Sequence, residues 1–214
     1  MRDHPLLALP DMREDQDAVC PVHPLPLRSL HWINAGTMLA MIGSGLAIQN
    51  SEPVVPFVVP PQLTLGDDLT AALQWHLAMM WLLGLNGLAY LAFGIWSGRF
   101  RHKLLPVSLR GVLRDVARAL KGRLSHDDLS VYNQVQRVMY LGVIALGVLA
   151  VLSGLSLWKP VQLSWLLALM DDFDTARIIH FACMSLILGF TLVHVGMALL
   201  VPRSMRLMVL GGNR

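Results

Sequence analysis

The chain has 214 residues, of which 55% are hydrophobic and 14% are charged, and its formal net charge is +3. This composition excludes an ordinary soluble domain and indicates a small helical membrane protein. Of the two cysteines, Cys20 lies in a polar segment and Cys183 in an apolar one. We therefore expect neither a disulfide between them nor a cysteine metal motif.

Four apolar segments long enough to span a bilayer follow one another along the chain. Their expected ranges are 27–49, 69–96, 138–157 and 176–201. Residues 1–26 are polar and rich in proline, without an apolar stretch of signal-peptide length, so we expect a tail followed by an uncleaved first span. Residues 27–206 are expected to form one membrane domain, and residues 207–214 a C-terminal tail.

The long connection between the second and third spans is basic. Residues 104–125 place leucine and valine at helical spacing on one face, and arginine and lysine on the other. That pattern predicts a basic amphipathic helix on the membrane surface, in contact with lipid. Because membrane topology by itself requires a basic loop, no nucleic-acid partner is expected.

The loop charges also indicate the orientation of the spans. Lysine and arginine are concentrated in the connection between the second and third spans and after the fourth, whereas the other two loops are mainly acidic. The positive-inside rule then predicts both termini in the cytoplasm. The expected fold is an all-α membrane protein, a bundle of four transmembrane helices.

Four histidines lie inside the expected spans, and ionisable residues there are costly and usually functional. His180 and His194 are 14 residues apart, which places them on one helix face and about 21 Å apart along the axis. With the predicted span directions, His31 and His194 share the cytoplasmic level, and His76 and His180 share the outer level. Two opposed imidazoles in an apolar bundle are the ligands of six-coordinate haem iron.

A histidine-lined metal or proton pathway is a second interpretation of the same residues. It would need carboxylates inside the spans, and the four predicted spans contain none. Haem content would separate these two interpretations.

Several stretches resemble the di-haem cytochrome b561-like superfamily of bacteria, which includes cytochrome b subunits of Ni/Fe hydrogenase, formate dehydrogenase and thiosulfate reductase. They are RSLHW around His31, the segment around His76, YNQVQRVMY before the third span, and ARIIHF with LVHV in the fourth. The resemblance covers residues 24–206 and is nearest to the thiosulfate-reductase-like members. It implies two haem b groups on the pairs His31/His194 and His76/His180, in a multi-pass protein of the bacterial inner membrane.

The resemblance further implies electron transfer between the quinone pool and a redox partner, a periplasmic molybdopterin-type oxidoreductase or another redox subunit. It implies two further groups of site residues: Tyr132, Asn133 and Gln136 for quinone, and Arg28, Arg137 and Arg177 for haem propionates. Helix capping is an equally open role for the first group, and arginines at span ends are common. The alternative function is that of a stand-alone superoxide:quinone oxidoreductase, as some small members of the superfamily are.

Overall fold

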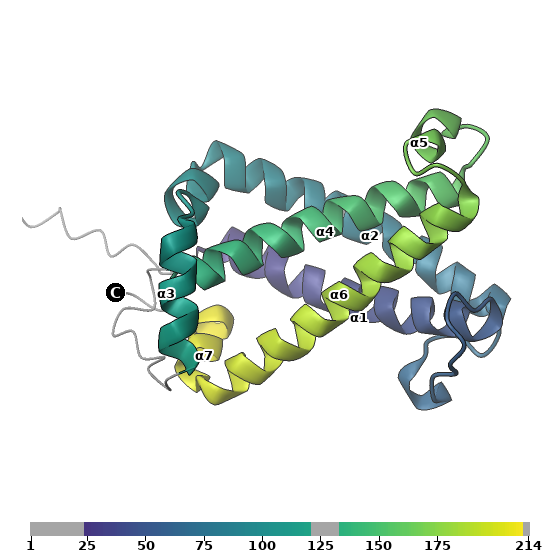
Figure 1. Cartoon of the computed structure of the whole chain (residues 1–214). Coiled ribbons are helices and arrows are strands. Elements are labelled where there is room, and N and C mark those ends of the chain that lie inside the picture. Colours follow the sequence, from purple (N-terminus) through teal and green to yellow (C-terminus); the bar gives the residue numbers. More distant parts are fainter. Residues whose placement is uncertain (1–23, 121–132, 212–214) are drawn as a thin grey trace, which may run out of the picture.

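The computed structural model describes residues 24–120 and 133–211. Within these ranges the chain is helical and contains no strand, which confirms the predicted all-α class. Four long helices form a bundle (Figure 1): α1 (Leu25–Ser51), α2 (Leu69–Trp96), α4 (Gln134–Trp158) and α6 (Phe173–Leu200). The shorter helices are η1 (Pro61–Leu63), η2 (Phe100–Leu104), α3 (Leu109–Leu120), α5 (Ser164–Ala168) and α7 (Pro202–Leu210).

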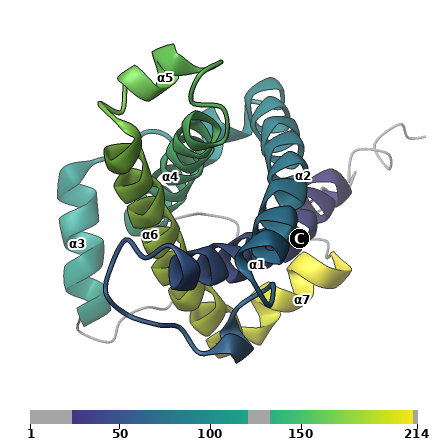
Figure 2. The same cartoon turned by 90° about the vertical axis from the view of Figure 1, so that its right-hand side faces the viewer.

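Three of the long helices are long and apolar enough to cross a membrane. They are α2, α4 and α6, with mean hydropathies of 1.6, 2.4 and 2.1. Helix α1 is of similar length, at 27 residues, but it buries the polar side chains of Thr37, Ser44 and Gln49. Three of the four predicted spans are therefore confirmed by length and composition, and α1 lies beside them in the bundle (Figure 2).

Polar side chains cap the starts of three long helices. Asp68 accepts a hydrogen bond from the N–H of Ala71 at the start of α2, and Asp172 accepts one from Thr175 at the start of α6. Helix α4 begins with a reciprocal capping box. Helices α4 and α6 consequently start four and three residues before the predicted spans at 138 and 176. The apolar stretch marks where lipid contact can begin, whereas the cap decides where the helical backbone begins.

The interior of the bundle is lined by small polar side chains. The largest side chains with less than 2% exposure are three serines, Ser44, Ser153 and Ser156. Leucines such as Leu39 and Leu85, in contrast, are 64% exposed. Small residues let helix backbones approach closely, and apolar side chains on the outside are suited to lipid. The distribution is therefore that of a membrane bundle.

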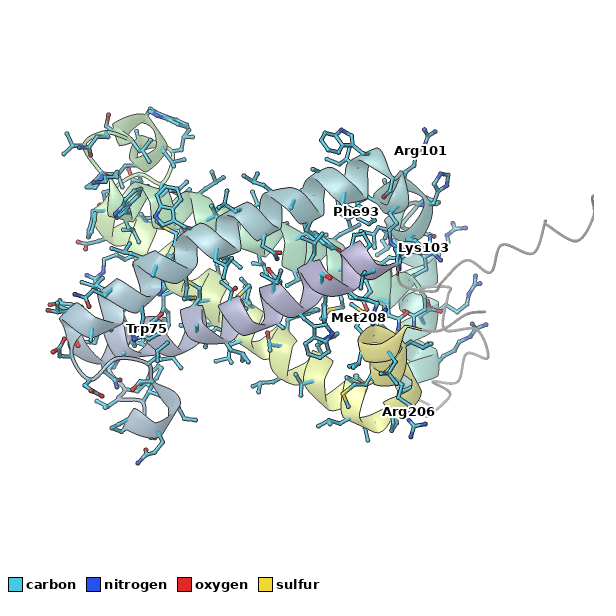
Figure 3. The ribbon with its side chains drawn as sticks, turned by 180° about the vertical axis from the view of Figure 1, so that it is seen from behind. Trp75, Phe93, Arg101, Lys103, Arg206 and Met208 are labelled. Atoms are coloured by element: carbon cyan, nitrogen blue, oxygen red, sulfur yellow. The ribbon has the colours of Figure 1, made fainter. Side chains whose placement is uncertain are left out.

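One end of the bundle carries a group of basic side chains. Helices α3 and α7 both lie at one end of the bundle, and α5 and η1 lie at the other (Figure 1). Arg101, Lys103 and Arg206 gather at the α3 end, and Trp75 lies toward the opposite end (Figure 3). Of the basic helix predicted at 104–125, residues 109–120 form α3, residues 105–108 are not helical, and residues 121–125 lie outside the described ranges.

Candidate functional site

The structure brings the four histidines of the predicted spans together in two pairs. The ring centroids of His31 on α1 and His194 on α6 lie 6.0 Å apart, and those of His76 on α2 and His180 on α6 lie 6.1 Å apart. A metal ion bonded at about 2 Å to one nitrogen of each imidazole would hold two centroids roughly 6 Å apart. Each pair therefore has the spacing that haem iron between two imidazoles requires.

The imidazoles of His76 and His180, the pair predicted to lie at the outer level, are hydrogen-bonded to serines. Ser44 Oγ lies 2.9 Å from Nδ1 of His76, and Ser153 Oγ lies 3.1 Å from Nδ1 of His180. Each hydroxyl donates its own proton to a carbonyl of its helix at 2.8 Å, so its oxygen accepts from the imidazole. The carbonyl of Ala150, 3.0 Å from Nδ1 of His180, can only accept. The Ala150 carbonyl thus assigns the proton of His180 to Nδ1, and the bond of Ser44 to its own helix favours the same tautomer in His76. In this tautomer Nε2 is left with the lone pair that binds a metal.

Two glycines lie against the same rings. A Cβ atom added at Gly154 of α4 would lie 3.0 Å from Cε1 of His180, and one at Gly45 of α1 would lie 3.6 Å from Cε1 of His76. The backbones of α1 and α4 thus approach the imidazoles directly, which helps to fix the ring positions. At Gly154 the approach leaves no room for a larger residue without movement.

The other pair, His31 and His194, contacts aromatic rings, and a buried amide lies near His31 in the sequence neighbourhood of Leu30. Trp32 contacts His31 edge-on at a centroid distance of 5.4 Å, and Phe190 stacks on His194 at 5.7 Å with an interplanar angle of 10°. Asn86 of α2 is buried and donates to the carbonyl of Leu30 at 2.9 Å. This bond ties α2 to α1 next to His31.

The three arginines predicted to bind propionates each contact a backbone carbonyl. Arg28 donates to the carbonyls of Met208 and Val209 at the end of α7, and Arg137 donates to Pro106 at 2.9 Å. Arg177 donates to the carbonyl of Glu52 at 3.0 Å and lies 3.8 Å from the carboxylate of Asp174. These contacts tie together the ends of helices, so a propionate role would share or replace them.

Of the residues predicted to bind quinone, two form the capping box of α4. Asn133 Oδ1 accepts from the N–H of Gln136, and Gln136 Oε1 accepts from the N–H of Asn133. Their side-chain NH₂ groups are therefore the donors that these residues could offer a ligand. Tyr132 lies outside the described residues.

Sequence reasoning did not select Ser44 or Ser153. One feature of the sequence could have drawn attention to them: both serines belong to a tripeptide Ser-Gly-Leu, at residues 44–46 and 153–155. A serine in a membrane helix usually bonds to its own backbone, so the tripeptide alone does not indicate a contact with histidine.

The fold and the site together define a helical membrane protein with two histidine pairs suited to haem iron. The family described as prokaryotic cytochrome b561 matches residues 22–211, and the chain belongs to this family. Membership confirms the family resemblance of the sequence and implies haem b. The chain is also similar to an Azospira oryzae protein named "Putative protein-methionine-sulfoxide reductase subunit YedZ1". The two are 48% identical over 190 residues, which cover 89% of this chain and 96% of the relative.

Proposed function

We propose that this protein is a di-haem b-type cytochrome that transfers electrons across the membrane between the quinone pool and a redox partner. The observation that carries the proposal is the pairing of four histidines at centroid distances of 6.0 and 6.1 Å. His180 and His194 belong to one helix and are 14 residues apart, so the two pairs are separated by about 21 Å along α6. A haem bound at each level would supply one-electron transfer.

The proposed topology is four transmembrane helices, including α1, with both termini in the cytoplasm of a bacterial cell and the domain at 27–206 in its inner membrane. Helix α1 supports this by packing along α2 and by supplying His31. The basic end with α3 and α7 would then face the cytoplasm. The N-terminal tail at 1–26 lies almost wholly outside the described residues, and the proposed tail after 206 begins within α7.

The partner is proposed from the relative. Its name describes a subunit of a protein-methionine-sulfoxide reductase. We propose that this chain likewise acts as the membrane subunit of an oxidoreductase, of the molybdopterin type that the resemblance implies, and passes electrons to it at the outer end. Quinone would bind near Tyr132, Asn133 and Gln136 at the other end.

Haem content tests the proposal. Purified full-length protein should show two b-type haems per chain by redox-difference spectroscopy and pyridine haemochrome assay. His31→Ala and His76→Ala should each lower the content toward one, because each removes a ligand from a different pair. His102→Ala is the matched control, because this histidine is exposed in η2 and should leave two haems in place. A wild-type protein without haem would refute the proposal and favour the histidine-lined pathway.

A further inference from the structure

The two tightly packed helix pairs of the bundle, α1 with α2 and α4 with α6, repeat one another. Helices α1 and α4 both carry Ser-Gly-Leu, at 44–46 and 153–155. Helices α2 and α6 both begin after an aspartate pair whose second member is the N-cap. In both helices an alanine with 0% exposure follows four residues after the N-cap, and a histidine of the outer pair follows eight residues after the N-cap. The alanines are Ala72 and Ala176, and the histidines are His76 and His180.

The repeat extends to the hydrogen bonds. Ser44 donates to the carbonyl of Ala40, and Ser153 donates to the carbonyl of Leu149, both at 2.8 Å. With its proton used in this way, each hydroxyl can offer only its oxygen to the facing Nδ1, at 2.9 Å and 3.1 Å. Each half of the chain thus supplies one histidine of the outer pair together with the acceptor that holds it.

We propose that Ser44 and Ser153 are positioning residues whose hydroxyl oxygens accept hydrogen bonds from Nδ1–H of the two outer imidazoles and so lower the reduction potential of the haem bound between them. The inference rests on the proposed function. An acceptor on Nδ1–H raises the basicity of the opposite nitrogen. A more basic ligand stabilises ferric over ferrous iron, so loss of either hydroxyl raises the potential. Both serines act on ligands of one iron, so both substitutions affect the same haem.

Redox titration of the full-length protein, followed in the visible spectrum, tests the inference. Ser44→Ala and Ser153→Ala should each lower the ferric-to-ferrous ratio of one haem at fixed ambient potential by about threefold to tenfold, where tenfold corresponds to 59 mV for one electron. The double variant should shift the same haem further. In Ser153→Ala the Ala150 carbonyl still keeps the proton on Nδ1, so the shift reports the lost bond rather than a changed tautomer.

Two buried hydroxyls on the same helices serve as matched controls. Thr37 on α1 donates to Ile33 at 2.8 Å, and Ser156 on α4 donates to the Ser153 carbonyl at 2.7 Å. Thr37→Val and Ser156→Ala should leave both potentials unchanged. Ser44→Thr and Ser153→Thr keep a hydroxyl and should retain the wild-type potential.

The outcomes separate this inference from the proposed function. Two haems with potentials that match those of the controls would overturn the inference and leave the proposed function intact, as would the two serines shifting different haems. If the alanine variants lose the outer haem and the threonine variants keep it, the hydroxyls position the ligands even more strongly than proposed. A wild-type protein without haem would overturn both.

Discussion

Gly154→Ala places one methyl group against the ring of His180. The added Cβ would lie 3.0 Å from Cε1, whereas ordinary contacts begin at 3.4 Å, so the ring or the helix must move by about 0.4 Å. Cε1 is bonded directly to Nε2, the nitrogen left to bind iron. The displacement therefore exceeds the roughly 0.2 Å tolerance of metal–ligand distances.

We expect Gly154→Ala to weaken haem binding at the outer pair by about 10- to 100-fold, the usual effect of disturbing the support of a metal ligand. The assay is the rate and extent of haem loss to an excess of apomyoglobin, with the remaining haem counted by pyridine haemochrome. Gly147→Ala on the same helix is the control, because a Cβ there meets nothing within 4 Å. Gly45→Ala, at 3.6 Å from His76, should also be tolerated. Wild-type haem retention in Gly154→Ala would refute the close approach of α4 to the ring.

Two further predictions concern the ends of the bundle. Arg28→Ala removes the bonds to the carbonyls of Met208 and Val209, so the amides of α7 should lose about 1–3 kcal/mol of protection in hydrogen exchange; unchanged protection would show that other contacts hold α7. The backbone N–H of Thr175, and then its hydroxyl, hold the pKa of Asp172 below its ordinary value. A lowered folded-state pKa stabilises the protein above the ordinary pKa of about 4, and this contribution is lost as the pH falls through the folded pKa. Thermal melts in acid should therefore show a loss of stability that is smaller in Asp172→Asn, which keeps the cap without the charge, and equal losses would contradict the assignment.

Both histidine pairs were predictable because the sequence gives the depth of each histidine in its span and the direction in which each span crosses the membrane. The spacing of His180 and His194 gives two levels, and loop charge gives the direction of each span. The structure pairs the rings in the same way, while haem ligation stays a prediction. The hydrogen bonds of Ser44 and Ser153 could not be predicted in this way. They depend on which helices are neighbours, and helical periodicity carries no information about neighbours.

Tertiary contacts determine the surroundings of Arg28. The sequence places this residue at the start of the first span but does not show which distant residues it contacts. The family resemblance implies a haem propionate as the partner of this arginine. In the structure its guanidinium bonds to carbonyls about 180 residues away, because α7 packs back against the first turn of α1. Trp32 donates to the carbonyl of Met208 at the same place, at 3.2 Å. Within the described residues, the carbonyls of Met208 and Val209 accept from side chains of α1 in place of an intrahelical N–H.

The charge of the end opposite α3 and α7, which is the proposed outer end, allows a test between the proposed function and the superoxide alternative. Six exposed carboxylates lie there: Glu52, Asp67, Asp68, Asp171, Asp172 and Asp174. Among the described residues, the cations at this end are Lys159 and Arg177, and Arg177 is paired with Asp174 at 3.8 Å. Superoxide is an anion, so this end should repel it at low ionic strength, and salt should screen the repulsion beyond about 10 Å at 0.1 M.

In stopped-flow mixing with superoxide, haem reduction in the isolated protein should therefore be slow in dilute buffer and should become faster as salt is added. The control is a small neutral reductant, whose rate should not depend on salt because it carries no charge for the carboxylates to repel. Fast reduction by superoxide in dilute buffer that slows with added salt would mean that the anion is attracted to its site. That result would favour the stand-alone superoxide:quinone oxidoreductase over an electron-transfer subunit.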